Sequence, residues 1–194
     1  MATTAPQRTP PPTVEEFLAL EEASSTKHEY VAGQIYSLAG ASDRHNRIAM
    51  NIAAQLWHAA RDGPCRVYGS DMRLRIADDA VYYPDVQVVC DPADTEESYK
   101  TRPCVVVEVL SPSTESIDLR EKLLAYRRLE SLRAYIIVYR DQMRVIRHYR
   151  AENNAWFDSL HASEADTVGF PCPEVDLTLA DVYRGLAPVA ATLS

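Results

Sequence analysis

The sequence contains no stretch that approaches the ~20 consecutive apolar residues of a membrane-spanning helix. Its first residues, MATTAPQRTPPPTVEEF, also lack the apolar core of a secretory signal. We therefore expect a cytoplasmic protein that does not cross a membrane. No internal repeat is visible along the chain.

Cysteine is scarce, and its spacing predicts no special chemistry. The four cysteines, Cys65, Cys90, Cys104 and Cys172, lie far apart and show neither CxxC spacing nor a disulfide framework. Cys90 and Cys104 fall within apolar runs typical of strands. We interpret them as small buried hydrophobic side chains rather than as metal ligands or redox centres.

Positive charge is also in deficit, because the net charge is −8. An acidic protein is a poor first candidate for a nucleic-acid binder. The charge is nevertheless unevenly distributed: residues 120–150 carry nine basic and three acidic side chains, and residues 151–194 carry one basic and seven acidic ones. The basic segment is either a solvated helix and strand surface or a phosphate-binding patch.

Length and composition indicate one globular domain. The chain has 194 residues, of which 46% are hydrophobic and 25% charged, and this is ordinary for a folded domain of this size. Residues 1–12 contain four prolines and are predicted to form a disordered leader. Residues 13–194 are predicted to form a single domain.

Hydrophobic periodicity predicts four helices and several strands. The first helix begins at Thr13 with a capping box completed by Glu16, and the second carries Ile48, Ile52 and Leu56 at helical spacing. The helices are expected near 13–22, 42–62, 114–129 and 178–183, and the strands near 33–40, 65–76, 81–90, 105–110, 134–140 and 143–150, with a weaker one around Trp156. This order favours an α/β (α+β) fold, a mixed β-sheet flanked by helices.

Two of these apolar strands each carry one acid. Glu108 lies inside the run VVVEVL, and Asp85 follows Pro84 in YYPDVQVV. A buried carboxylate needs a compensating partner. If the two strands pair, both carboxylates converge, and they repel each other unless a divalent cation lies between them. Oxygen ligands of this kind suit Mg²⁺ or Mn²⁺ and fit phosphodiester hydrolysis.

The same residues resemble the PD-(D/E)XK nuclease superfamily. The fuller series HEYVAGQIYSLAG, RHNRIAMNIAAQL, YYPDVQVV and VVVEVLSPST followed by DLREKLLAYRRL resembles the Uma-type family of restriction endonucleases. The resemblance runs from Thr13 to Tyr183. It implies a restriction-endonuclease-like core, an Mg²⁺-dependent endonuclease acting on nucleic acid, with DNA as the expected substrate, and a homodimer.

The sequence departs from the superfamily pattern at one position. The pattern places a lysine two residues after the strand acid, and this chain has Leu110 there. By matching position, the resemblance to the Uma-type family implies that Lys122 in the following helix takes that role. Asp118, Lys122 and Tyr126 are spaced by four residues on one helix face. The alternative for Lys122 is a solvated residue paired with Asp118.

Further candidates each have a structural alternative. Glu29 resembles a family acid just before the first strand and is either an additional metal ligand or a surface residue. His45 shares a helix face with Ile48 and either points into the cleft or makes an ordinary hydrogen bond. Gln87 is a candidate contact to a metal-bound water. Arg73 and Arg75 are weak candidates for phosphate contact, and their alternative is a solvated strand edge. Ser111 is expected to cap the following helix.

Three functions remain open at this point. The first is a metal-dependent nuclease with Asp85, Glu108 and Lys122 as catalytic residues. The second is a catalytically inactive, endonuclease-like dimer with an interaction or regulatory role, which the negative net charge and Leu110 favour. The third is hydrolysis of a small phosphate ester at the same site. No motif for direct readout of bases is apparent.

Overall fold

The structure, a computed structural model, describes residues 10–110 and 117–187. The expected cap at Ser111 lies outside these residues. The elements in chain order are α1 (Val14–Glu22), β1 (His28–Val31), β2 (Gln34–Ser37), α2 (Asp43–Ala60), β3 (Arg66–Gly69), β4 (Arg73–Ile76), β5 (Ala80–Tyr82), β6 (Val86–Val89), β7 (Tyr99–Lys100), β8 (Val105–Leu110), the π-helix η1 (Ile117–Lys122), α3 (Leu123–Arg127), β9 (Ala134–Tyr139), β10 (Val145–Arg150), β11 (Trp156–His161), β12 (Thr167–Pro171), β13 (Glu174–Thr178) and α4 (Leu179–Val182).

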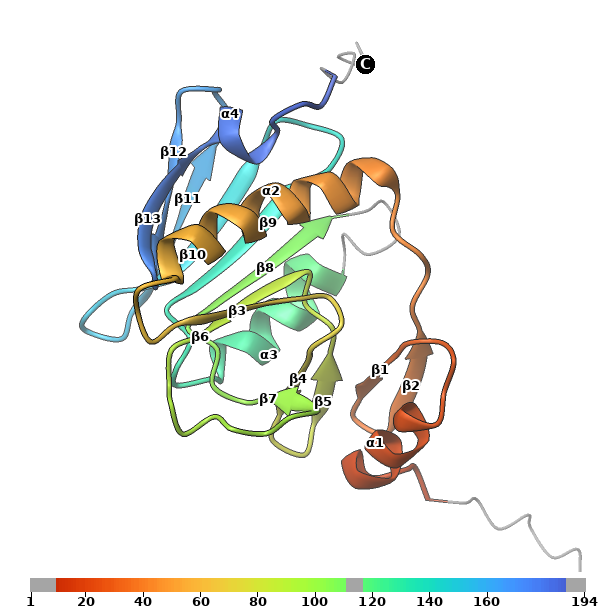
Figure 1. The fold of residues 1–194 in the computed structure, drawn as a ribbon. Helices are drawn as coiled ribbons and strands as arrows, with labels where there is room; N and C mark the ends of the chain where they lie inside the picture. Colours follow the sequence, from red (N-terminus) through yellow and green to blue (C-terminus); the bar gives the residue numbers. More distant parts are fainter. Residues whose placement is uncertain (1–9, 111–116, 188–194) are drawn as a thin grey trace, which may run out of the picture.

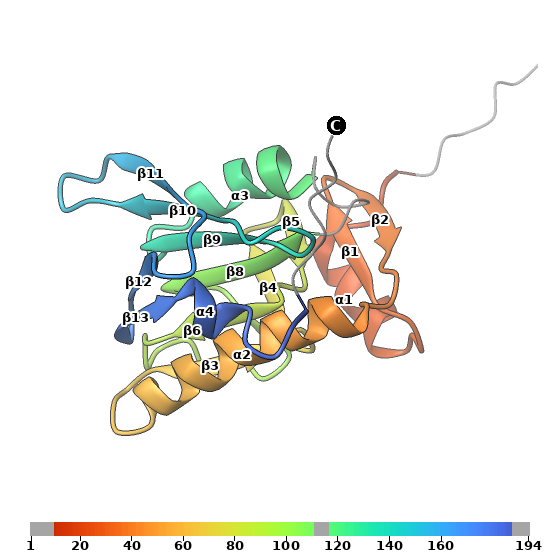
Figure 2. The same cartoon turned by 90° about the horizontal axis from the view of Figure 1, so that it is seen from above.

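A six-stranded sheet forms the centre of the fold (Figure 1), in the order β11-β10-β9-β8-β6-β3. It is a mixed sheet, because β8 runs parallel to β9 while its other neighbour, β6, is antiparallel. Helix α2 covers one face and α3 the other (Figure 2). The predicted mixed sheet flanked by helices is therefore confirmed.

Two smaller sheets accompany it in the described part of the chain. A five-stranded sheet has the order β2-β1-β5-β4-β7, and β12 pairs with β13. The predicted strands at 65–76 and 81–90 are wrong as continuous elements, since each divides into two strands that belong to different sheets. A turn closed by Met72 N–H donating to the Gly69 carbonyl, at 3.1 Å, separates β3 from β4. Pro84, which has no N–H for a ladder, separates β5 from β6.

The valine run of β8 is buried on both faces. Val105, Val107 and Val109 pack with Ile48, Ile52 and Leu56 of α2, whereas Val106 and Leu110 pack with Tyr126 on the α3 side. A strand covered on both faces needs apolar residues at every position, which explains the lack of alternation. Glu108 shares the α3 side with Val106 and Leu110 because side chains alternate along a strand.

The helix starts are well predicted. Thr13 Oγ1 accepts from Glu16 N–H while the Glu16 carboxylate accepts from Thr13 N–H, so the predicted capping box is present. Ser42 caps α2, and Thr178 caps α4. Of the predicted leader, residues 1–9 lie outside the described chain, and the Pro12 carbonyl accepts a hydrogen bond from Tyr30 Oη at 2.9 Å. Within the described ranges, no helix is long and apolar enough to cross a membrane.

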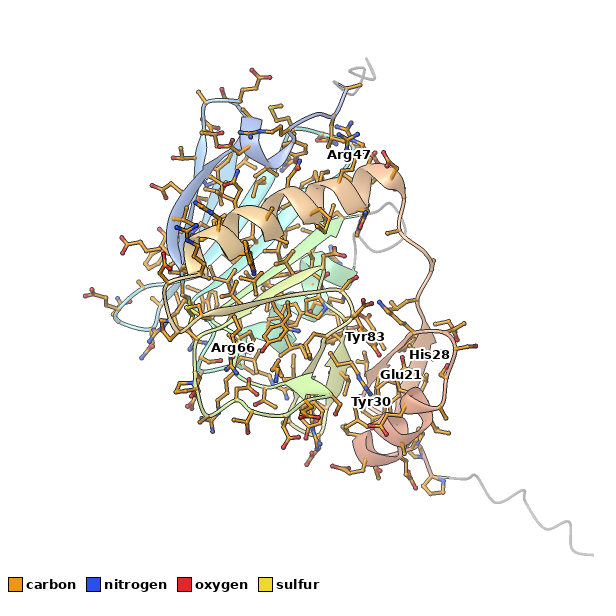
Figure 3. The ribbon with its side chains drawn as sticks, in the orientation of Figure 1. Glu21, His28, Tyr30, Arg47, Arg66 and Tyr83 are labelled. Carbon is orange, nitrogen blue, oxygen red and sulfur yellow. A yellow bond between two sulfur atoms is a disulfide. The ribbon has the colours of Figure 1, made fainter. Side chains whose placement is uncertain are left out.

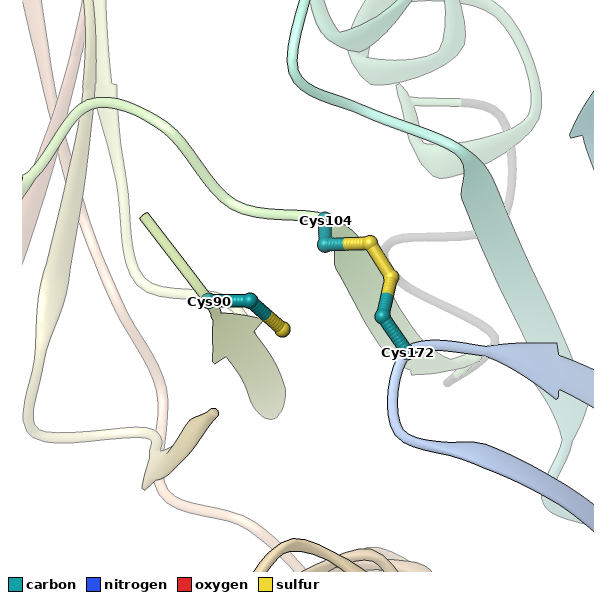
Figure 4. Close-up of side chains that lie close together, drawn as sticks. All are labelled: Cys90, Cys104 and Cys172. Carbon is teal, nitrogen blue, oxygen red and sulfur yellow. A yellow bond between two sulfur atoms is a disulfide. The ribbon is translucent and has the colours of Figure 1, made fainter. Parts of the chain in front are cut away.

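The interpretation of the cysteines as unpaired hydrophobic residues is wrong. Cys65 is disulfide-bonded to Cys90, and Cys104 to Cys172, across 25 and 68 positions of sequence. Figure 4 shows Cys90 beside the Cys104–Cys172 bond, with its sulfur directed toward it. Spacing alone did not reveal this arrangement because the pairing of β3 with β6, and the packing of the β12–β13 turn against the main sheet, bring distant segments together.

His148 makes the stability of this fold depend on pH. Burial is the main cause that lowers its pKa below the ordinary value of 6.5, although Asp158 opposes the shift. As the pH falls, the unfolded chain therefore binds this proton before the folded protein does. The free energy of unfolding should decrease from about pH 6.5 downward, until the folded protein also binds the proton, by about 1.4 kcal/mol per unit of pKa difference. Denaturation between pH 7.5 and 5 should show a smaller loss for His148→Gln than for His161→Gln, and equal losses would contradict this assignment.

Candidate active site

The pairing of β6 with β8 places Asp85, the residue before β6, at the same end of the ladder as Glu108 of β8. Val86 lies opposite Val107 in the antiparallel register, so the next pair outward is Asp85 and Glu108. The two strands thus pair as the sequence analysis required. Asp85 Oδ2 also accepts a 2.7 Å hydrogen bond from Val109 N–H, which fixes its carboxylate at the end of β8.

His45 reaches this point from the first turn of α2. Its Nε2 lies 3.2 Å from Asp85 Oδ2, and its Nδ1 is buried with no hydrogen-bond partner among the described atoms. Burial, the largest single effect, lowers the pKa of His45, but the hydrogen bond and charge of Asp85 and a contact with the Val109 backbone together raise the pKa above its ordinary value. The imidazole therefore lines the site and is also hydrogen-bonded to Asp85, so both predicted alternatives describe it.

Lys122 bridges two buried carboxylates. Its Nζ lies 3.0 Å from Glu108 Oε1 and 3.1 Å from Glu29 Oε1. The exposed fractions are 5% for Lys122, 4% for Glu108 and 8% for Glu29, so the alternative of a solvated lysine does not hold. Glu108 Oε1 also accepts from Tyr126 Oη at 2.8 Å. The positive charge that Glu108 requires thus comes from the helix after β8, not from position 110.

The local helix geometry places Lys122 over the sheet. Lys122 ends the π-helix η1, and Tyr126 lies in the α-helix α3 that follows. Single turns of π-helix are frequent at functional sites. Lys122 Nζ lies 5.3 Å from the centre of the Tyr82 ring, and burial followed by the charge of Glu108 raises the pKa of Tyr126. Both rings therefore shield the ion pairs from water.

Glu29 lies within β1 rather than before it, and it accepts from Tyr83 N–H at 3.2 Å. A second buried acid, Glu21, holds the neighbouring residues: its carboxylate accepts from His28 N–H at 2.8 Å and from Tyr83 Oη at 2.9 Å. Figure 3 shows Glu21, His28 and Tyr83 gathered between α1 and the five-stranded sheet. These hydrogen bonds hold Tyr83, which follows β5 and lines the candidate site.

The candidate catalytic and metal-binding residues line one cavity of about 650 Å³. Its wall includes Glu29, His45, Asp85, Glu108 and Lys122. Two further cations, Lys27 and Arg140, line it as well, and sequence reasoning did not single them out. The signals available were the position of Lys27 two residues before Glu29 and that of Arg140 in the basic segment. A volume of this size accommodates a nucleotide-sized ligand.

Three predicted candidates do not line this cavity. The Gln87 side chain is fully buried, and its Nε2 donates to the Met72 carbonyl at 2.7 Å, so it fastens the turn before β4. Arg75 pairs with Glu15 and Asp78, each at 2.7 Å. Arg73 lies near Tyr83, on whose hydroxyl its charge acts, but it is not part of the cavity wall.

The side chains present fit a hard divalent cation. Three carboxylates share one cavity, and carboxylate oxygens are the ligands that Mg²⁺ and Mn²⁺ prefer in proteins. The unpartnered Nδ1 of His45 adds a buried polar atom that protein groups in the described part of the chain do not satisfy. Asp85 and Glu108 are the candidate ligands, and Glu29 is a third.

Comparison with known proteins gives the relatives of this chain. The family model "Uma2: Putative restriction endonuclease" matches residues 14–179. Uncharacterized protein slr1290 of Synechocystis sp. is 33% identical over 175 residues, which cover 89% of this chain and 92% of that protein. Uncharacterized protein sll1609 of the same organism is 32% identical over 148 residues, covering 74% and 84%.

A solved structure shares the architecture. It is the crystal structure of a putative nuclease belonging to DUF820 from Anabaena variabilis, with a TM-score of 0.73 and 18% sequence identity. The match covers 89% of this chain and 98% of that one. The likeness shows that this chain has the fold of that protein.

Proposed function

We propose that this chain, which belongs to the Uma2 family described as putative restriction endonucleases, is a metal-dependent endonuclease that hydrolyses phosphodiester bonds of DNA. The observation that carries the proposal is the meeting of Asp85, Glu108, Glu29 and Lys122 in one cavity. Family membership and the nuclease-like fold support it.

The proposed cofactor is Mg²⁺ or Mn²⁺, held by Asp85 and Glu108 with Glu29 as a third ligand. When bound, the ion supplies a Lewis acid for a phosphate oxygen and lowers the pKa of a water. Val109 N–H fixes the orientation of the Asp85 carboxylate. Tyr126 Oη does the same for Glu108, so both ligands are oriented before the cation binds.

In this proposal Lys122 takes the catalytic role that the superfamily pattern gives to a lysine at position 110. Leu110 is 3% exposed and packs in the apolar cluster around Tyr126, so a lysine there would bury an ammonium among apolar side chains. Lys122 instead approaches Glu108 from η1. In the proposed reaction its ammonium positions the attacking water or neutralises the charge that develops on phosphate.

Lys27 and Arg140 are the proposed phosphate contacts. They line the cavity, and each cation that contacts a phosphate raises affinity by releasing a counterion. We expect the Lys27→Ala, Arg140→Ala variant to bind duplex DNA more weakly and to lower the slope of log affinity against log salt by about 2. Fluorescence anisotropy in Ca²⁺ across a salt series measures both. The control is Arg61→Ala, an exposed cation that does not line the cavity. An unchanged slope in the paired variant would exclude Lys27 and Arg140 as phosphate contacts.

The direct test is cleavage by the wild-type protein. Supercoiled plasmid, single-stranded DNA, RNA and a small phosphodiester are each incubated with Mg²⁺, Mn²⁺ or a chelator. Cleavage of DNA that needs the divalent ion supports the proposal. Cleavage of the small phosphodiester alone would show that the substrate is a small phosphate ester. The absence of all cleavage, together with the absence of Mn²⁺ binding by calorimetry, contradicts a metal-dependent enzyme.

A second candidate function rests on the same ion pairs. Lys122 already neutralises Glu29 and Glu108 in part, as expected for a non-catalytic, endonuclease-like protein with an interaction role. This alternative is favoured if the protein binds neither Mn²⁺ nor DNA at low salt.

We also propose a homodimer. Exposed apolar side chains on α2, Met50 at 57% and Trp57 at 64%, support an association surface, and two active sites suit the cutting of two strands. Sedimentation at micromolar concentration distinguishes the dimer from a monomer.

A further inference from the structure

The four cysteines of the chain form one cluster. They come from four segments: Cys65 precedes β3, Cys90 follows β6, Cys104 precedes β8, and Cys172 lies in the β12–β13 turn. The sulfurs of Cys90, Cys104 and Cys172 all lie within 4.8 Å of one another, and Cys65 is bonded to Cys90. We propose that these four cysteines, when reduced, bind one zinc-class divalent metal ion as four thiolates.

The spacing of the sulfurs suits such a site. Four thiolates at a Zn–S distance of about 2.3 Å form a tetrahedron whose sulfurs are roughly 3.8 Å apart. The sulfurs of Cys90, Cys104 and Cys172 already lie within 4.8 Å of one another, and the disulfide to Cys90 brings the Cys65 sulfur to the same cluster. Figure 4 shows Cys90 pointing toward Cys104 and Cys172 from a different strand. Side-chain rotations, rather than a change of fold, therefore convert the disulfides into a tetrahedral ligand set.

The surroundings favour thiolates and allow access. Each of the four cysteines is half-buried, so an ion and a reductant can reach them. Arg66 follows Cys65 directly, and its guanidinium donates to the Asp91 carbonyl, at 2.7 Å, in the loop that follows Cys90. A nearby guanidinium stabilises thiolate over thiol. Arg66, the residue next to Cys65, thus supplies one positive charge against the negative charge of the thiolates.

The cluster is separate from the candidate active site. Cys104 and Glu108 are four positions apart along β8, which is roughly 13 Å of extended strand. Both sites nevertheless use the pairing of β6 with β8, since Cys90 and Cys104 end the ladder whose other end carries Asp85 and Glu108. A metal ion would therefore fasten β3, β6, β8 and the β12–β13 hairpin together without touching the nuclease ligands.

The conversion balances with a dithiol as reductant. Each disulfide takes two electrons from one dithiol, which becomes a cyclic disulfide, and gives two protein thiols. Metal binding then releases the four thiol protons. In a reducing compartment structural disulfides are rare, whereas tetrathiolate zinc sites persist. Oxidation of the four thiolates to two disulfides would expel the ion.

Cobalt provides the test, because Co²⁺ bound by thiolates has an intense near-ultraviolet charge-transfer band that carboxylate ligands do not give. The full-length protein is reduced with a phosphine, desalted without oxygen and titrated with Co²⁺. We expect the band to saturate at one ion per chain and to be abolished by one equivalent of Zn²⁺. Excess Mg²⁺ should leave it unchanged, which separates this site from the nuclease site.

Variants assign the ligands. Cys172→Ser should weaken Co²⁺ binding by at least about tenfold and reduce the charge-transfer intensity, whereas Glu108→Gln should keep both. In case Cys172→Ser does not fold, alkylation of the wild-type protein gives a second readout: Zn²⁺ should protect all four cysteines together. A folded, reduced wild-type protein that shows no thiolate band and no Zn²⁺ protection would overturn the proposal.

Discussion

Glu108→Gln is expected to lower DNA cleavage by roughly three orders of magnitude. The substitution keeps the shape of the side chain and an oxygen that can still accept from Tyr126 Oη, now 2.8 Å from Glu108. It removes the negative charge that would hold the divalent ion, and losing one such electrostatic interaction costs catalysis about 10²–10³-fold or more. Lys122 keeps Glu29 as a partner, at 3.1 Å, so the variant should fold.

Two measurements check this expectation. Plasmid cleavage gives the loss of rate, and calorimetry with Mn²⁺ gives the loss of binding. Glu130→Gln is the matched control, because Glu130 is an exposed acid beyond the end of α3, and it should cleave as the wild type does. If Glu108→Gln prepared in the same way cleaved at the wild-type rate, the activity would not come from this site.

Lys122→Met is expected to lower the free energy of unfolding by about 3–5 kcal/mol in the absence of divalent ions. Methionine preserves much of the volume but removes the cation shared by Glu29 and Glu108. The two carboxylates, 8% and 4% exposed, would then remain buried near each other without their common partner. The cost of an uncompensated buried charge exceeds that of losing an exposed ion pair, which is ~0–1 kcal/mol.

Urea denaturation at one ionic strength measures the loss. Lys27→Met is the control, because the Lys27 side chain is 42% exposed and pairs with an exposed acid, Asp71, and its loss should stay within about 1 kcal/mol. The double variant Lys122→Met, Glu108→Gln should be more stable than Lys122→Met alone, because one uncompensated charge is gone. A double variant less stable than the single one would show that the two side chains do not form a coupled pair.

Local patterns were sufficient for much of the fold. Thr13 with Glu16 predicted a capping box, and the four-residue spacing of Ile48, Ile52 and Leu56 predicted the buried face of α2. Both are confirmed. The apolar run around Glu108 predicted a strand covered on both sides, which β8 is. These signals are read from residues close in sequence, where backbone geometry fixes which side chains share a face.

The division of 65–76 and 81–90 between two sheets was beyond such signals. A turn and a proline were visible in the sequence, but the sheet that each half would join depends on partners far along the chain. The same limit applies to Arg73, Arg75 and Gln87. Their strand faces were predicted from alternation. Their distance from the cavity instead follows from how the five-stranded sheet is placed against the six-stranded sheet.

The sequence by itself determined that Glu108 lies on an apolar strand and that Lys122 shares a helix face with Tyr126, whereas Asp85, predicted on a strand, lies in the bend just before β6. Only the tertiary structure decided that Lys122 lies between Glu108 and Glu29, and that four cysteines from four segments meet. The physical reason is that periodicity fixes the direction of a side chain relative to its own element. Contacts between elements depend on strand order and on the packing of whole faces, which no local spacing encodes.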